Sequence, residues 1–180
     1  KIDLIILCAG KSKKNYKKIE NITNYKSSFE NNFFSTTNVL ESYLKIYKYA
    51  KTKIIVISSI AGSKILEGAP ITYSVAKNAL NFYVKFKSKE LAKYKICINT
   101  ISPGNILMKG NNWYLNKKKN KRKVMNYIKK NVPLNNFCKP ENIFLLCKFL
   151  MDDKNDSTTG SDFIIDSGQG EGFCLGNILK

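Results

Sequence analysis

The sequence has no histidine, and Arg122 is the only arginine among its 31 basic residues. Without histidine the chain can build neither a Ser-His-Asp triad nor a Cys-His dyad, and it lacks the commonest metal ligand of proteins. Five cysteines are scattered along the chain without a Cys-x-x-Cys pair: Cys8, Cys97, Cys138, Cys147 and Cys174. We therefore expect free, mostly buried thiols and no metal site.

Long hydrophobic runs and targeting signals are also missing. No apolar run approaches the ~20 residues that a membrane-spanning helix requires, and the Lys1 start carries neither a signal peptide nor an initiator Met. The length of 180 residues and the hydrophobic content of 43% are typical of a soluble protein with one core. We expect a single domain over residues 1–180, a cytoplasmic location, no membrane contact, and a chain that is a portion of a longer polypeptide.

Negative charge is scarce, with 13 Asp and Glu residues against 31 Lys and Arg, and the formal net charge is +18. Clustered cations gain affinity for nucleic-acid phosphates through counterion release. However, bidentate recognition of bases and phosphates favours arginine, and nearly all of this charge is lysine. Lys, Asn and Ile are abundant together, as an AT-rich coding sequence would produce. We therefore expect no nucleic-acid partner, and a basic nucleic-acid binder is only a third hypothesis.

The hydrophobic pattern predicts a doubly wound α/β fold. Short apolar runs at 2–7, 53–57, 96–101 and 163–165 are typical of parallel strands covered on both faces. Between them, apolar side chains recur every three or four residues in 29–47, 76–84 and 140–151, which predicts helices. Loops at the carboxyl ends of such strands build a ligand crevice, and Gly10, Ser59 and Pro103-Gly104 fall at these ends.

The most informative stretch is a strand ending at Ser58-Ser59, followed by a helix with Tyr73 and Lys77 four residues apart. This spacing places a phenol and an ammonium group on one helix face. A phenol ionises near pH ~10, so it is a poor acid or base at neutral pH unless a positive charge stabilises its anion. The pair therefore indicates acid–base chemistry in which Lys77 lowers the pKa of Tyr73. The alternative is a helix-start tyrosine with its hydroxyl in solvent.

Further motifs follow one order along nearly the whole chain. They are LCAG at 7–10, Asn32, ISSIAG at 57–62, YSVAK at 73–77, NTISPG at 99–104, TG at 159–160 and IIDSG at 164–168. This ordered set resembles the short-chain dehydrogenase/reductase family, whereas a Tyr-x-x-x-Lys pair alone arises by chance in lysine-rich sequences. The resemblance implies a Rossmann-like sheet and an oxidoreductase that interconverts an alcohol and a ketone with NAD or NADP.

The resemblance also implies four catalytic residues. Tyr73 exchanges a proton with the substrate oxygen, and Ser59 hydrogen-bonds the same oxygen. Lys77 lowers the pKa of Tyr73 and hydrogen-bonds the nicotinamide ribose. Asn32 holds a water in a proton relay to the lysine, with the adjacent Asn31 as the alternative register.

Cofactor contacts follow from the same resemblance. The Pro-Gly turn lies against the nicotinamide, and the backbone of Ile106 meets its carboxamide. The implied cofactor-binding residues are Ala9, Gly10, Tyr73, Lys77, Pro103, Gly104 and Ile106. Glycine and proline at these positions also form turns whatever the function, so their ligand role depends on the resemblance.

The chain departs from the family pattern in several places. It has no strand, glycine-rich turn and helix to receive a pyrophosphate. The resemblance therefore implies that the first βαβ portion is missing, that the chain begins at the fourth strand, and that this strand has an unpaired edge. Cys8 replaces an Asn, Met108 replaces a Thr near the cofactor, Ser167 replaces a Gly, and the interval from Ser59 to Tyr73 is one residue longer than usual.

Residues 107–135 are rich in Lys and Asn and, by the resemblance, form an insertion at the place of the substrate lid. Within them, we expect the segment 109–131 to be a polar insertion that is part helix. A basic lid would suit a phosphorylated, carboxylated or nucleotide-linked substrate, and a sugar derivative or an acyl-carrier-linked ketone would fit. Codon drift is the alternative explanation of the lysines.

Two hypotheses compete for the function. The first is an NAD(P)-dependent enzyme with a small-molecule substrate. The second is a non-catalytic remnant of the fold that serves as an oligomerisation or binding module. Homo-oligomerisation through the helices around 32–47 and 73–91 is implied by the family.

Overall fold

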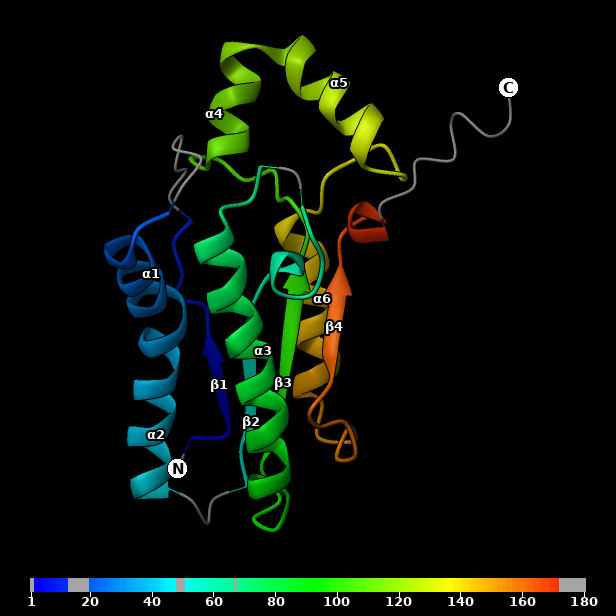
Figure 1. The fold of residues 1–180 in the computed structure, drawn as a ribbon. Coiled ribbons are helices and arrows are strands. Elements are labelled where there is room, and N and C mark those ends of the chain that lie inside the picture. Colours follow the sequence, from blue (N-terminus) through cyan, green and yellow to red (C-terminus); the bar gives the residue numbers. More distant parts are fainter. Residues whose placement is uncertain (1, 13–19, 48–50, 67, 172–180) are drawn as a thin grey trace.

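A computed structural model describes residues 2–12, 20–47, 51–66 and 68–171. Its centre is a sheet of four parallel strands in the order β1 (Leu4–Leu7), β2 (Lys53–Ile57), β3 (Cys97–Pro103) and β4 (Asp162–Ile165). All four strands point their carboxyl ends toward the same end of the molecule (Figure 1). The predicted parallel α/β fold is confirmed, with strand boundaries that differ from the prediction by at most two residues.

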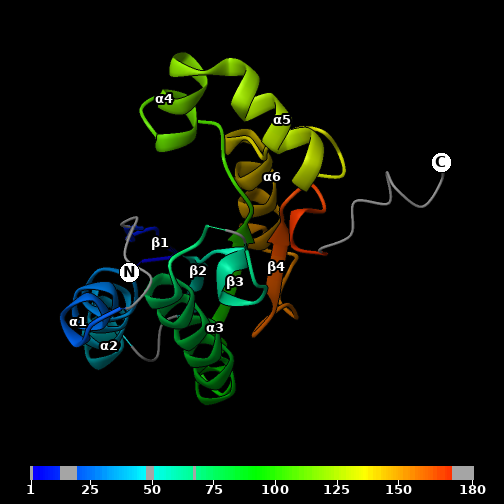
Figure 2. The ribbon, with the colours of Figure 1, turned by 45° about the horizontal axis from the view of Figure 1, so that its top comes forward.

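Helices cover both faces of this sheet. On one face lie α1 (Ile22–Phe29), α2 (Ser35–Tyr47) and α3 (Ile71–Ala92), and on the other lies α6 (Pro140–Met151), as Figure 2 shows. The predicted helix at 140–151 is confirmed. The helix predicted at 29–47 begins earlier, at Ile22, because Asn21 caps its first turn by accepting a hydrogen bond from the Asn24 N–H.

The alternation of side chains along β2 explains this layering. Ile54 and Val56 face α2 and α3, where they pack with Leu40 and Leu80. Ile55 points to the opposite face, where it packs with residues of α6 such as Leu150. A strand buried on both sides needs apolar residues at consecutive positions, which is why the run at 53–57 shows no polar alternation.

The insertion after β3 forms a helical cap above the carboxyl ends of the strands (Figure 1). It consists of α4 (Asn112–Lys119) and α5 (Lys121–Asn131), so it is more helical than the sequence predicted. Asn111 and Asn120 each accept a backbone hydrogen bond that starts the helix after them. The cap has a small core of its own, formed by Val124, Ile128, Val132 and Phe137.

Strand β1 lies at the edge of the sheet and pairs only with β2 within the described residues. The expected unpaired edge is therefore confirmed for this part of the chain, and Ile6 on it is 46% exposed. None of the described helices combines the length and the apolar character that a membrane crossing would demand.

Candidate active site

A cavity of about 450 Å³ lies at the carboxyl ends of the strands, below the helical cap. Residues from five separate segments line it. They include Gly10 after β1, Ser59 after β2, Tyr73 at the start of α3, Gly104 and Ile106 after β3, and several residues of the cap. The structure thus brings together at one cavity five of the residues that the sequence assigned to a site.

Ser59 is placed by the short turn that follows β2. Its Oγ accepts a hydrogen bond from the Ala61 N–H at 3.2 Å and so caps a single 3₁₀ turn, Ile60–Gly62. The turn packs directly on α3, because a Cβ at Gly62 would lie only 2.7 Å from the backbone carbonyl carbon of Lys77. Only glycine permits this approach, which holds Ser59 close to the start of α3.

Tyr73 and Ser59 line the same cavity, and the Ser59 side chain interacts with the phenol of Tyr73. Burial raises the pKa of Tyr73 above its ordinary value, and the interaction with Ser59 only partly opposes this shift. Lys77 is not among the groups that shift this pKa, so the expectation that Lys77 lowers the pKa of Tyr73 stays a prediction. Desolvation disfavours the phenolate, and Tyr73 is a neutral phenol at neutral pH.

Lys77 lies one turn further along α3 and is only 2% exposed. Its Nζ donates to the Ile57 carbonyl at 3.2 Å and lies 6.0 Å from the centre of the Tyr73 ring. Burial lowers the pKa of Lys77 to about 8, while the neighbouring Cys8 acts in the opposite direction. The structure thus confirms that the phenol and the amine are neighbours on one helix face.

Asn32, and not Asn31, points into the molecule. It is completely buried, within a π-helical turn at Glu30–Phe34 that joins α1 to α2. Its Oδ1 accepts from the Lys11 N–H at 2.8 Å, and its Nδ2 donates to the Lys11 carbonyl at 2.9 Å. Asn32 therefore fixes the segment that follows β1, and the water relay that the resemblance implied stays a prediction.

Gly10 sits where these groups converge. A Cβ on Gly10 would lie 3.1 Å from both the Asn32 Oδ1 and the Lys77 Nζ. The backbone thus passes over the amine and the amide at close range. Ala9 and Pro103, which were expected to contact a cofactor, do not line the cavity, although each precedes a glycine that does.

Beyond β3, a buried glutamine that the sequence reasoning missed organises the cavity wall. The Gln169 Oε1 accepts from the Asn105 N–H at 3.0 Å, and its Nε2 donates to the Tyr127 hydroxyl at 3.2 Å. Gln169 follows the recognised motif at 164–168 directly, at the carboxyl end of β4. This position could have identified Gln169 from the sequence, because the carboxyl ends of parallel strands lie at the ligand crevice.

The structure shows where residues that depart from the family pattern lie. Ser167 has a φ of 59°, in the left-handed region that favours glycine, which agrees with its standing in place of a Gly. Met108 is 51% exposed. Of the cysteines, Cys138 and Cys147 are buried as expected, Cys97 is half-buried and Cys8 is exposed, and all four are free. Cys174 lies outside the described residues.

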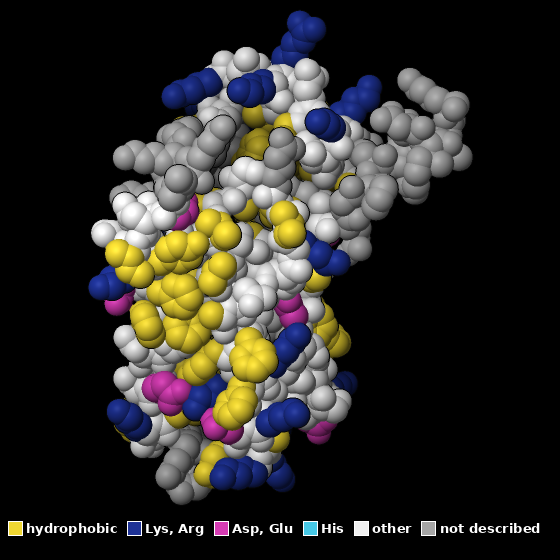
Figure 3. Space-filling model, in the orientation of Figure 1, with side chains coloured by type: hydrophobic (Ala, Val, Ile, Leu, Met, Phe, Trp, Pro, Cys, Tyr) yellow, Lys and Arg dark blue, Asp and Glu magenta, His cyan; other side chains and the backbone are white. Residues whose placement is uncertain are grey.

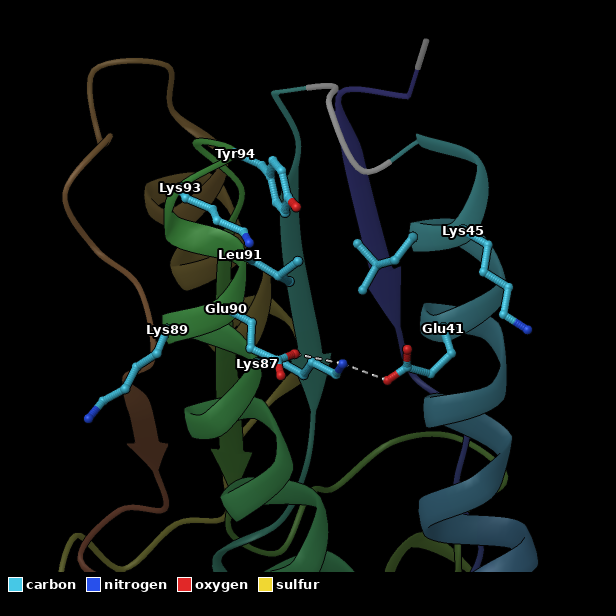
Figure 4. Close-up of a pocket in the computed structure, with 9 residues that line it drawn as sticks. Glu41, Lys45, Lys87, Lys89, Glu90, Leu91, Lys93 and Tyr94 are labelled. Atoms are coloured by element: carbon cyan, nitrogen blue, oxygen red, sulfur yellow. Dashed lines mark hydrogen bonds and ion pairs between the residues drawn. The ribbon is translucent and has the colours of Figure 1, made fainter.

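A larger cavity, of about 610 Å³, lies between the C-terminal ends of α2 and α3 (Figure 4). Its Lys87 is held by Glu41 at 2.9 Å and by Glu90 at 2.8 Å, so both carboxylates of the lining are paired with this lysine. It contains none of the predicted site residues and is not the candidate site. Across the described ranges, no cluster of three or more metal-ligating side chains occurs.

Comparisons with known proteins agree with this arrangement. A family model described as "Enoyl-(Acyl carrier protein) reductase" matches residues 1–169. Acetoacetyl-CoA reductase of Cupriavidus necator is 29% identical over 116 residues, which are 64% of this chain and 44% of that protein. L-xylulose reductase of Mesocricetus auratus is 30% identical over 125 residues, 68% of this chain and 48% of that protein. The chain therefore spans about half the length of these curated relatives.

Solved structures show the same fold. An oxidoreductase of the short-chain dehydrogenase/reductase family from Burkholderia thailandensis has a TM-score of 0.82 at 23% identity, covering 94% of this chain and 65% of that one. A short-chain dehydrogenase family protein from Francisella tularensis has a TM-score of 0.79 at 25% identity, covering 93% and 70%. With a family model matched over most of its length and this fold, the chain belongs to the short-chain dehydrogenase/reductase family.

Proposed function

We propose that the protein is an NAD(P)-dependent oxidoreductase that interconverts an alcohol and a ketone, with Tyr73 as the proton donor and acceptor. The observation that carries the proposal is the contact of Tyr73 with Ser59 at the wall of the cavity, with buried Lys77 one turn away. Membership of the family supports it. Relatives named for NADP or solved with NADH or NADPH support the choice of cofactor.

The chain's own residues fit the nicotinamide end of such a cofactor. Gly10 and Gly104 contribute to the cavity lining, and Lys77 uses only one of its three N–H groups to bind the described protein, at the Ile57 carbonyl. Lys77 would bind ribose hydroxyls, and the backbone at Ile106 would hold the carboxamide. When bound, the cofactor supplies the hydride chemistry.

Ser59 and Tyr73 act together on the substrate oxygen. Ser59 aligns that oxygen with the phenol, because small misplacements of reacting groups reduce rates strongly. Tyr73 gives its proton to the oxygen as a ketone is reduced and takes it back as an alcohol is oxidised. The raised pKa of Tyr73 keeps that proton in place at neutral pH, which favours reduction.

This protonation state predicts different pH profiles for reduction and for oxidation. Because the pKa of Tyr73 is raised, the phenolate that oxidation requires becomes more abundant as pH increases. We expect reduction to vary little between about pH 6 and pH 9, and oxidation to rise by up to about tenfold per pH unit. Initial rates in both directions, measured on the complete polypeptide, test this. Oxidation that peaks at neutral pH and then declines would contradict the assignment of Tyr73.

A difference spectrum of the complete polypeptide with each nicotinamide cofactor tests the function itself. Binding with hydride transfer to or from a ketone/alcohol pair supports the enzyme. Binding of neither cofactor would favour the non-catalytic remnant, which the comparisons do not favour. The relatives include proteins named acetoacetyl-CoA reductase, L-xylulose reductase and D-erythrulose reductase, so acyl-carrier-linked and sugar-derived substrates are both within the proposal.

We also propose that the protein forms a homo-oligomer through the face of α1 to α3. Figure 3 shows a continuous hydrophobic patch over α1 and the N-terminal half of α3. On α3, the exposed apolar side chains share one helix face: Ile71, Val75, Phe82 and Phe86. Exposed apolar patches of this kind mark interaction surfaces.

Replacing Phe82 and Phe86 together by Asp should break this association. Phe82 is 70% exposed, so the change leaves the protomer core intact while it places charge in the proposed interface. Light scattering after size exclusion should show a smaller particle with unchanged circular dichroism. Leu134→Asp is the matched control, since Leu134 is 69% exposed outside α1 to α3. A mass that is unchanged, or changed equally by the control, would argue against this interface.

A further inference from the structure

The cap side of the active-site cavity is polar but uncharged. Its lining there consists of Asn105, Asn111, Asn112, Trp113, Asn116 and Tyr127, and the described lining of the whole cavity contains no Lys, Arg, Asp or Glu. The lysines of the cap lie elsewhere. Lys117, for example, lines a separate cavity of about 520 Å³ together with Met108 and Met125. The basic insertion therefore does not give this cavity the charge that an anionic substrate needs.

Tyr127 is oriented so that it can only donate a hydrogen bond to a ligand. The Asn105 N–H fixes the amide of Gln169 by donating to its Oε1, so the Gln169 Nε2 faces Tyr127 and donates to its hydroxyl oxygen at 3.2 Å. The Asn105 Nδ2 donates to the same oxygen at 3.4 Å. Both lone pairs of that oxygen therefore accept hydrogen bonds, and the hydroxyl can make a further bond only by donating its own hydrogen. Within the described residues no acceptor takes this hydrogen, and Tyr127 lines the cavity.

Two side-chain amides of α4 can also form hydrogen bonds with a ligand. Asn112 and Asn116 are four residues apart on one helix face, line the cavity, and make no side-chain hydrogen bond to the described protein. Asn111 is different, because its Oδ1 caps α4 and its Nδ2 donates to the Ile106 carbonyl at 2.6 Å. Free amides can both donate and accept, which matches hydroxyl groups. An apolar substrate such as a steroid would leave them without partners.

Trp113 supplies a flat apolar surface beside these groups. Its ring lies 4.7 Å from that of Tyr127 and 4.8 Å from that of Phe137, so the cap core holds it in place. A half-buried aromatic ring next to amides and a hydroxyl suits a molecule that has C–H faces and hydroxyl edges.

We propose that this cavity takes an uncharged polyhydroxy ketone or the corresponding polyol, and that Tyr127 determines this specificity by donating a hydrogen bond to a second substrate oxygen. The inference rests on the proposed function and narrows it, since it disfavours phosphorylated and acyl-carrier-linked substrates. A site built to hydrogen-bond a hydroxyl strongly rejects an analogue that lacks it.

The test compares a ketopentose, its phosphate ester, 2-pentanone and acetoacetyl-CoA as substrates of the complete polypeptide with its cofactor. We expect kcat/KM for the ketopentose to exceed those of the other three by about 100-fold or more. Tyr127→Phe should lower kcat/KM for the ketopentose by about 10- to 100-fold, mainly through KM, and should leave 2-pentanone within about twofold. Tyr114→Phe, on the same cap but outside the cavity lining, should change neither.

Gln169→Glu is a second variant that keeps shape and the bond from the Asn105 N–H. It replaces the Nε2 donor by an acceptor, so the Tyr127 hydrogen turns to the glutamate and away from the cavity. Gln169→Glu should therefore reproduce the loss caused by Tyr127→Phe, and the double variant should lose no more than either alone. Equal kcat/KM values for the ketopentose and 2-pentanone, or variants that leave their ratio unchanged, would overturn the proposal while the oxidoreductase function stands.

Fluorescence gives a readout that does not require turnover. Trp113 is the chain's only tryptophan and lies at the proposed subsite. A pentitol should change its emission, 1-pentanol should not, and Trp113→Phe should remove the change. Pentitol binding without any turnover would support this inference and contradict the proposed function. No emission change with either compound would overturn the inference.

Discussion

Tyr73→Phe should reduce turnover of the complete polypeptide by about 10²- to 10⁴-fold while cofactor affinity changes little. The substitution removes only the hydroxyl that exchanges a proton with the substrate. The ring remains packed at the start of α3, so the cavity keeps its shape. Steady-state rates together with cofactor titration separate the two effects, because a loss of kcat at constant affinity identifies a group that acts on the reacting atoms.

Tyr83→Phe is the matched control for that experiment. Tyr83 lies ten residues further along the same helix, and its hydroxyl donates to the Glu41 carboxylate at 2.6 Å, away from the cavity. The chemical change is identical, so its turnover should stay near that of the wild type. Turnover that survives in Tyr73→Phe, or that falls equally in both variants, would refute the role of Tyr73.

Lys77→Met should stabilise the folded protein at pH 7 and abolish turnover. The pKa of buried Lys77 falls from 10.5 to about 8, a shift that corresponds to about 3 kcal/mol of destabilisation when the amine is charged. Replacement removes this penalty and also the hydrogen bond to the Ile57 carbonyl, which is worth about 1 kcal/mol. The expected net gain is therefore about 2 kcal/mol in the free energy of unfolding.

The pH dependence identifies the cause of this gain. Between pH 8 and 10.5 the unfolded chain binds the Lys77 proton more tightly than the folded protein, so wild-type stability rises with pH in this window. The advantage of Lys77→Met should thus be complete below about pH 8 and should shrink toward pH 10.5. Denaturant unfolding at several pH values measures it. Lys85→Met, at an exposed position of α3, should gain little, and an equal gain there would contradict the explanation.

Most of the fold could be predicted because its signals are local. The run at 53–57 is buried on both faces, and a proline starts the helix at 140–151, so burial and capping agree with the sequence pattern. The apolar period alone indicates α3 only over 76–84, whereas the family resemblance extended this helix to about 73–91, close to the observed Ile71–Ala92. The two cap helices were predicted only as a partly helical insertion, because the abundant lysines and asparagines leave just four buried apolar residues as a periodic signal.

The candidate site could be predicted only in its motif residues. Ser59, Tyr73 and Lys77 fall within recognised motifs, and the structure brings them together. The choice between Asn31 and Asn32 needed the π-helical turn, which arises from tertiary contacts and has no reliable sequence signal. The pKa of Tyr73 could not be predicted from charge alone, because the sequence does not reveal how strongly the phenol is desolvated. Gln169 acts through residues that are more than 40 positions away.

The separate core of the cap has an evolutionary consequence. Val124, Ile128, Val132 and Phe137 pack with one another and belong to neither of the clusters that cover the two faces of the sheet. Substitutions in α4 and α5 therefore affect mainly the packing of the cap itself and leave the two clusters on the sheet unchanged. Substitutions in the cap can change which substrates bind without changing the catalytic residues below it. The lysine-rich surface of the cap is an expected product of such freedom.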